Sequence, residues 1–329
     1  MPQTRIAEER VQKDKDKPDE LAWSLALAAA DHAERMAASD QRAVFALGED
    51  GQLRALPVGH PDALLAWRPG IGWEPLLPSD DPRHPIIDLY LPVCSATALR
   101  PITVGHLGQS LDGFIATHAG ESQFVTGQEN ILHLHRMRAL CDAVVVGAGT
   151  VAADDPQLTT RHVPGPSPVR VVFDPGRGLA PEYRVFNDGL APTLYICAHS
   201  LVRAGETHVG LATIVGLDGG EMLGVAELLG LLRGRGCRRI FVEGGGVTVS
   251  AFLEANLLDR LQMAIAPLII GNGRPAIRLP PRAALSDCRR PRYRVFRMGG
   301  DVLFDCEFSS SGDAADEGMT DTPPVTRVI

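Results

Sequence analysis

Several features that mark common classes of protein are missing from this chain. Lysine occurs only at Lys13, Lys15 and Lys17, so arginine supplies nearly all of the positive charge. With 40 acidic and 32 basic residues the net charge is −8, and no overall positive field favours nucleic acid as a partner. No run of eighteen apolar residues appears, and the polar N-terminus lacks the apolar core of a signal peptide. We therefore expect a cytoplasmic protein that binds neither membrane nor nucleic acid.

The six cysteines are scattered and contain no CxxC pair, which favours reduced thiols over a disulfide framework or a zinc site. His32-Ala33-Glu34 matches the His-x-Glu of zinc deaminases, but that chemistry also needs a Pro-Cys-x-x-Cys motif, which the chain lacks. We interpret His32 and Glu34 as solvated residues of a helix and expect no metal.

The 329 residues are 45% hydrophobic, enough for one large domain with an appendage or for two domains. Residues 1–18 are charged, poor in apolar residues and predicted to be disordered, as is the Ser- and Asp-rich tail 309–329. Residues 19–99 form a small α+β extension of unknown role. Its predicted elements are a helix over 19–36, a hairpin over 41–58, an irregular segment over 59–84 and a strand over 86–93.

Strands and helices alternate over residues 100–308, which predicts an α/β domain with a mostly parallel sheet. In such sheets ligands bind beyond the carboxyl ends of the strands. A closing hairpin adds antiparallel strands. The predicted strands are 102–107, 143–147, 169–174, 193–197, 212–215, 239–242, 260–266, 293–298 and 302–308, and the helices are 127–140, 221–233 and 247–256.

Three consecutive glycines, Gly244 to Gly246, lie between the strand that ends at Val242 and the helix from residue 247. Their backbone N–H groups and the positive end of the helix dipole suit a phosphate, and Glu243 could accept hydrogen bonds from a ligand nearby. An equally good interpretation is a turn that lets helix and strand pack closely.

A second glycine motif, Gly147 to Ala152, matches the Gly-x-Gly-x-x-Ala of dinucleotide-binding folds. Asp154-Asp155-Pro156 would stop a helix within about two turns, so a standard Rossmann unit is disfavoured. A short helix that presents Gly149 and Thr150 to a ligand remains possible.

Polar residues of the predicted helix 127–140 can be interpreted as structural, without a functional role. His133 and His135 are predicted to be surface residues, and Arg138 to offset the helix dipole. Arg161 lies in a loop, where its guanidinium could clamp an anion. Taken alone, both arginines are interpreted as solvated.

The order of the motifs is more specific than any one of them. From residue 100 to about 308 the chain closely resembles the reductase domain of bacterial riboflavin biosynthesis proteins, which has a dihydrofolate-reductase-like fold. The blocks that carry the resemblance are Ser-Leu-Asp-Gly at 110–113, Glu-Ser-Gln-Phe at 121–124, Arg-x-Arg-Ala at 136–139, Asp-Ala-Val-Val-Val-Gly-Ala-Gly-Thr-Val at 142–151, Ala-Asp-Asp-Pro-x-Leu-Thr at 153–159 and Val-Glu-Gly-Gly-Gly at 242–246.

The resemblance implies an NADPH-dependent reductase that transfers hydride to the ribose C1′ of a phosphoribosylamino-pyrimidine. It also implies a phosphorylated small-molecule substrate and a homodimer. Asp154 and Glu243 become candidate catalytic residues. The implied cofactor contacts are Gly108, Phe124, Thr150, Asp154, Gly245, Gly246, Val247 and Thr248. The implied substrate contacts are Ser122, Arg138, Leu158, Arg161 and Glu243.

This chain departs from the family pattern in two ways. His106 stands where the family commonly has a lysine, so the contact of an ammonium group cannot be assumed. Residues 1–99 lack the cysteine motif of the deaminase that bifunctional members carry. A relative that reduces a different heterocycle or imine, and a nucleotide-binding sensor without catalysis, are the alternatives, and the sequence does not decide the exact substrate or NADPH against NADH.

Overall fold

The computed structural model describes residues 2–218 and 224–308. The chain forms two compact units, with the boundary between Pro101 and Ile102, and each unit is described by itself. The tail 309–329, predicted to be disordered, lies outside the described residues. In the part of the chain that is described, no helix combines the length and apolar character needed to cross a membrane.

Unit 1 is a four-stranded antiparallel sheet with two helices, ordered β2-β1-β3-β4. Its core includes packed aromatic rings: the Trp67 and Trp73 rings meet edge to face with centroids 5.1 Å apart, and Trp73 Nε1 donates to the Ala29 carbonyl at 3.0 Å. The elements are α1 (Pro2–Ser39), β1 (Ala43–Leu47), β2 (Leu53–Leu56), β3 (Leu65–Arg68), β4 (Gly72–Pro75) and α2 (His84–Cys94).

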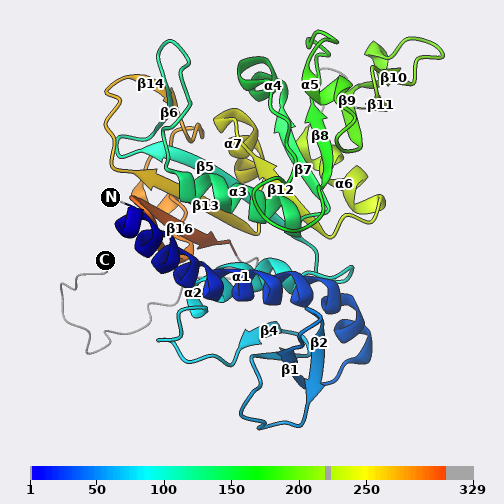
Figure 1. Ribbon diagram of the computed structural model, residues 1–329. Helices are drawn as coiled ribbons and strands as arrows, with labels where there is room; N and C mark the ends of the chain where they lie inside the picture. The colour runs from blue at the N-terminus through cyan, green and yellow to red at the C-terminus, as the bar shows by residue number, and fades with distance from the viewer. Residues whose placement is uncertain (1, 219–223, 309–329) are drawn as a thin grey trace. The chain divides into compact units, whose positions relative to one another are not determined.

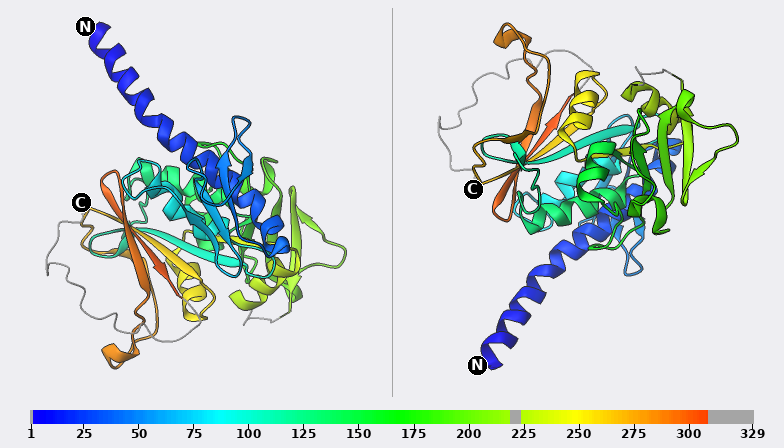
Figure 2. Two further views of the ribbon diagram at one scale, coloured as in Figure 1. Left: turned by 90° about the horizontal axis from the view of Figure 1, so that it is seen from below. Right: turned by 90° about the horizontal axis from the view of Figure 1, so that it is seen from above.

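Three predictions for unit 1 differ from the structure. Residues 2–18 continue α1 instead of lacking order, and Figure 2 shows α1 as one long helix; their Glu, Gln, Lys and Arg have good helix propensity despite their charge. Residues 59–84 contain β3 and β4, since Trp67 and Trp73 pack in the core. Residues 86–93 are helical, because Ile87, Leu91 and Cys94 recur at helical spacing on one buried face.

Unit 2 consists of a ten-stranded sheet with helices on its faces and a separate two-stranded ribbon (Figure 1). The strand order is β10-β11-β9-β8-β7-β12-β5-β13-β16-β15. Its elements are β5 (Ile102–Ser110), β6 (Phe114–Thr117), α3 (Gln128–Leu140), β7 (Ala143–Gly147), α4 (Ala148–Asp154), β8 (Val169–Phe173), α5 (Arg184–Asn187), β9 (Thr193–Ala198), β10 (His208–Val209), β11 (Ala212–Leu217), α6 (Val225–Gly234), β12 (Arg239–Glu243), α7 (Gly246–Glu254), β13 (Arg260–Ala266), β14 (Gly273–Pro275), β15 (Arg292–Met298) and β16 (Asp301–Glu307).

The seven strands from β11 to β13 pair in parallel, and the pairs β10–β11, β13–β16 and β16–β15 are antiparallel. The predicted α/β class with a mostly parallel sheet is confirmed. Helices α6 and α7 cover one face through an apolar cluster that includes Leu228 and Phe252, packed with Val145 and Val242. The sheet therefore brings the carboxyl ends of β5, β7, β8 and β12 to one edge, where a ligand would bind.

Candidate functional site

The geometry of the glycine turn before α7 shows close packing and is compatible with the predicted phosphate contact. Gly244 and Gly245 have φ of 74° and 70°, a left-handed conformation that glycine adopts without strain. A Cβ on Gly246 would lie 2.3 Å from the Ala276 carbonyl oxygen, so this glycine lets the segment after β14 pack against the helix. The turn thus combines close packing with backbone N–H groups that are left for a ligand.

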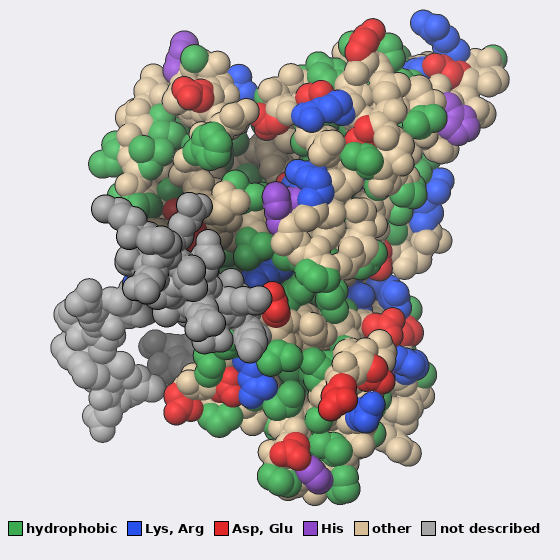
Figure 3. Space-filling view, viewed as in Figure 1, with side chains coloured by type: hydrophobic (Ala, Val, Ile, Leu, Met, Phe, Trp, Pro, Cys, Tyr) green, Lys and Arg blue, Asp and Glu red, His purple; other side chains and the backbone are tan. Residues whose placement is uncertain are grey.

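A cavity of about 440 Å³ opens beside this turn. It lies among the ends of β7, β8 and β12 on one side and the β6–β14 ribbon on the other, and Figure 3 shows this face of unit 2 hollowed, with arginine and histidine side chains beside the hollow. Apolar groups such as Ile115, Phe173 and Val225 supply part of the wall. Of the residues proposed for cofactor or substrate, the cavity is lined by Ser122, Thr150, Asp154, Gly245, Gly246, Val247 and Thr248.

Two arginines on the cavity wall were not anticipated from the sequence. Arg274 on β14 and Arg278 just after it line the cavity, and the Arg278 backbone N–H donates to Ser250 Oγ of α7 at 2.8 Å. No local pattern marks them, because β14 reaches the cavity only by pairing with β6, which is about 160 residues earlier. Their charges make the cavity suitable for an anionic ligand.

The short helix α4 places Thr150 and Asp154 on the cavity. It ends at Asp155, whose φ of 40° stops the helix, so the predicted helical turn in place of a full Rossmann helix is confirmed. Ser122 Oγ donates to Asp154 Oδ1 at 3.1 Å, which joins a proposed substrate contact to a proposed cofactor contact.

Glu243 ends β12 directly before the glycine turn and forms a buried ion pair with Arg138 of α3. Arg138 Nε donates to Glu243 Oε2 at 2.7 Å, and Nη2 donates to Oε1. A third donor, Arg138 Nη1, reaches the Thr159 carbonyl at 3.1 Å. The interpretation of Arg138 as a solvated arginine is therefore wrong, because its side chain is only 8% exposed.

Arg161 approaches the same residue, Thr159, from the other side. Its Nη1 donates to Thr159 Oγ1 at 2.8 Å, and its backbone N–H donates to His135 Nδ1 at 2.9 Å. Burial, followed by the charges of Arg138 and Arg184, lowers the pKa of the Arg161 guanidinium. Within residues 2–218 and 224–308 no carboxylate forms an ion pair with Arg161. The guanidinium groups of Arg138 and Arg161 and the carboxylate of Glu243 together carry a net positive charge.

The prediction that His133 and His135 are surface residues is wrong, because α3 turns a polar side toward the sheet. His133 Nε2 bonds Gln262 Oε1 at 2.9 Å, and Asn130 Oδ1 bonds His106 Nε2 at 3.0 Å. Burial lowers the pKa of His106 to about 4 and that of His133 to about 3. Both imidazoles are neutral near pH 7, so His106 brings no positive charge to the position where the family has lysine.

Besides Arg138, Arg161 and Glu243, which form the cluster described above, three further proposed site residues do not line the cavity. Gly108 packs beside Thr126, whose Cγ2 would lie 2.8 Å from a Cβ at that position. Phe124 is 82% exposed with φ of 63°, and Leu158 is buried with φ of 57°. None of the three lines the cavity. Within the described residues no group of three or more His, Cys, Asp or Glu side chains could hold a metal ion.

A family model for the RibD C-terminal domain matches residues 102–293, more than half of the chain. The chain belongs to this family. The 2,5-diamino-6-ribosylamino-4(3H)-pyrimidinone 5′-phosphate reductase of Methanothermobacter thermautotrophicus is 34% identical over 212 residues, which cover 62% of this chain and 97% of that protein. The resemblance inferred from the ordered motifs is confirmed, and the chain is an oxidoreductase whose family implies a nicotinamide cofactor.

The bifunctional relatives are longer than the shared region. The riboflavin biosynthesis protein RibD of Aquifex aeolicus is 31% identical over 208 residues, which span 63% of this chain and 58% of that protein. The crystal structure of a diaminohydroxyphosphoribosylaminopyrimidine deaminase/5-amino-6-(5-phosphoribosylamino)uracil reductase from Thermotoga maritima aligns with a TM-score of 0.55 at 25% identity, over 68% of this chain and 61% of that one. The dihydrofolate-reductase-like fold expected for unit 2 is confirmed.

We predict that Gly245→Ala weakens cofactor binding. The left-handed φ costs a non-glycine residue about 1–2 kcal/mol, and the new Cβ would lie 2.7 Å from Thr150 Oγ1 at the cavity wall. The cofactor Kd, measured by fluorescence titration, should rise about tenfold or more. Gly230→Ala, in the middle of α6 with open space around its Cβ, is the matched control and should leave Kd unchanged. Equal Kd for Gly245→Ala and wild type would contradict this role of the turn.

We predict that acid destabilises the fold through its buried histidines. Because the folded pKa values of His106 and His133 are lowered, the unfolded chain binds more protons below pH 6.5 and stability falls as pH drops toward 4. Each group contributes about 1.4 kcal/mol per pH unit within that window. His133→Gln removes one such group, so urea unfolding at pH 7 and pH 5 should show a smaller loss than in wild type. An equal loss in both proteins would rule out His133 as a source.

Proposed function

We propose that this chain is an NADPH-dependent reductase that acts on a phosphoribosylamino-pyrimidine. The names of its relatives suggest the substrate class. When bound, the nicotinamide supplies the hydride that reduces C1′ of the opened ribose. The observation that carries the proposal is the convergence of Arg138 and Arg161 on Thr159, where Arg138 also pairs with Glu243, the residue before the glycine turn that lines the cavity.

The cavity has the chemistry that a dinucleotide phosphate requires. The N–H groups of the turn at Gly245 and Gly246, at the positive end of the α7 dipole, would hold the pyrophosphate together with Arg274 and Arg278. Apolar groups at Phe173 and Pro175 offer a surface for the rings. Thr150 and Asp154 would fix the end of the cofactor that faces Ser122.

The substrate half is built around the positive charge of Arg161. Among the residues that the structure describes, no carboxylate forms an ion pair with Arg161, and a bidentate guanidinium suits a 5′-phosphate. Arg138 is already committed to Glu243, so its part is to hold the Glu243 carboxylate in place. Glu243 then accepts hydrogen bonds from the amino and ring N–H groups of the pyrimidine. Neutral His106 supports α3 through Asn130 and leaves the charge of the site to the arginines.

NADPH oxidation tests the proposal most simply. The full chain should consume NADPH when 5-amino-6-(5-phosphoribosylamino)uracil or its 2,5-diamino-pyrimidinone counterpart is added, and not without substrate. Turnover with another imine alone would favour a relative with a different substrate. Cofactor binding with no turnover on any of these would instead favour a nucleotide sensor, and absence of cofactor binding would defeat all three interpretations.

We predict that Arg161→Ala raises KM for the phosphorylated substrate. Loss of a charge-assisted pair costs about 1.5–3 kcal/mol, which corresponds to about ten- to a hundredfold in KM. The dephosphorylated substrate lacks the group that Arg161 would contact, so wild type and variant should treat it alike. Arg161→Lys should recover part of the affinity as a point charge. An equal loss for both substrates would show that Arg161 does not bind the phosphate.

A further inference from the structure

The segment that carries Arg161 leaves α4 in an unusual backbone conformation. Asp155 and Leu158 have φ of 40° and 57°, a left-handed conformation that residues other than glycine rarely adopt. Such a backbone persists only where surrounding contacts hold it. The segment 155–161 (the substrate loop) connects the proposed cofactor contact Asp154 to the proposed phosphate contact Arg161, so whatever holds this backbone also fixes the spacing of those two groups.

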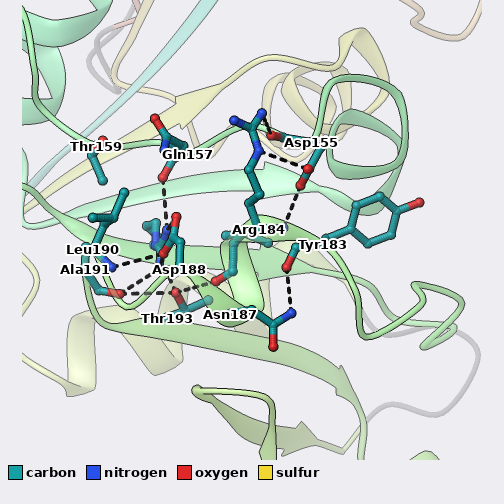
Figure 4. A network of polar contacts seen from close by, with 12 residues as sticks. Asp155, Gln157, Thr159, Tyr183, Arg184, Asn187, Asp188, Leu190, Ala191 and Thr193 are labelled. Atoms are coloured by element: carbon teal, nitrogen blue, oxygen red, sulfur yellow. Dashed lines mark hydrogen bonds and ion pairs between the residues drawn. The ribbon is translucent and has the colours of Figure 1, made fainter.

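One anchor of the substrate loop comes from the first residue of α5. The Arg184 backbone N–H donates to Asp155 Oδ1 at 2.7 Å, and its Nε donates to Oδ2 at 3.0 Å. Arg184 Nη2 also donates to the Asp155 carbonyl oxygen. Figure 4 shows the Arg184 side chain extended toward Asp155. Arg184 therefore binds both carboxylate oxygens and the backbone carbonyl of Asp155, the residue with the left-handed φ.

A second anchor holds the middle of the substrate loop. Arg170 of β8 is 1% exposed, and its Nη1 donates to the Gln157 carbonyl at 3.1 Å. The same guanidinium is oriented by Asp188 Oδ2 at 2.8 Å, the Ala191 carbonyl at 2.8 Å and Thr193 Oγ1 at 2.9 Å. In Figure 4 Asp188, Ala191 and Thr193 gather below Gln157. These three partners fix the orientation of the Arg170 guanidinium. In that orientation Nη1 also faces the Gln157 carbonyl of the substrate loop.

We propose that Arg184 and Arg170 are positioning residues that set substrate affinity by fixing the substrate loop. Neither needs to touch the substrate. Arg184 binds Asp155, and Arg170 binds the Gln157 carbonyl. Together they keep Thr159 where both Arg138 and Arg161 donate hydrogen bonds to it. The proposal rests on the proposed function for the identity of the ligand, but the anchoring itself can be measured without turnover.

Arg184→Gln tests the first anchor, since the side chain is 53% exposed and its loss leaves no buried cavity. The substrate KM should rise about tenfold, because a small displacement of a binding group is costly. The cofactor KM should stay within about twofold, because α4 holds Asp154 independently. Amide hydrogen exchange at residues 157–161 should become faster. Arg68→Gln, which removes an ion pair of similar exposure in unit 1, should change none of these.

The double variant Arg184→Gln/Asp155→Asn separates positioning from general destabilisation. If both residues act through one contact, the double variant should have the same substrate KM as either single variant. Additive increases would overturn the anchoring by this pair, as would an unchanged KM with unchanged exchange. Arg170→Lys keeps the charge but loses the planar guanidinium with its several donors. It should raise the substrate KM and the rate of amide hydrogen exchange at 157–161 in the same way.

The outcomes distinguish this inference from the proposed function. If wild type turns over the phosphoribosylamino substrate and Arg184→Gln matches it in KM and exchange, the anchoring is wrong and the function stands. If wild type shows no turnover, the function fails. Hydrogen exchange and calorimetric titration with ribose 5-phosphate then still test the loop: faster exchange and weaker binding in Arg184→Gln support the anchoring, and identical behaviour overturns it.

Discussion

The ion pair between Arg138 and Glu243 ties together the parts of unit 2 on which the site depends. It connects the last turn of α3 to the end of β12, one residue before the glycine turn, and the third donor of Arg138 reaches the substrate loop at Thr159. Burying two charges costs several kcal/mol per ion unless geometry and further hydrogen bonds compensate. Because replacing a buried ion pair by hydrophobic residues is often neutral or stabilising, we interpret the ion pair as a constraint kept for the site.

The polar side of α3 follows from the same constraint. Asn130, His133 and Arg138 point toward His106, Gln262 and Glu243 of the sheet, where apolar residues would usually pack. On the opposite face, α6 and α7 pack on the sheet through an apolar cluster. The face that α3 covers combines buried apolar residues such as Val144 and Phe241 with these polar groups, which lie near the carboxyl ends of the strands.

The sequence predicted the sheet of unit 2 well because its strands are short apolar runs separated by glycine and proline. The boundaries of β7, β12 and β13 differ from those expected by at most one residue. It failed where partners are distant: His133 and His135 look like surface residues until Gln262 and Arg161 are placed beside them. Arg274 and Arg278 escaped notice because only the pairing of β14 with β6 brings them to the cavity. Residues 86–93, which are apolar apart from Asp88, fit either a strand or a helix, so the sequence alone does not distinguish the two.

If Glu243 binds the substrate, loss of its charge should impair the reaction of the substrate and leave cofactor binding unchanged. Glu243→Gln keeps the volume and one hydrogen-bond acceptor but removes the charge, so its kinetics give the most direct test. We expect kcat/KM for the phosphoribosylamino-pyrimidine to fall by about a hundredfold or more, with cofactor Kd within about twofold of wild type. Near-wild-type kcat/KM in a folded Glu243→Gln protein would contradict the account.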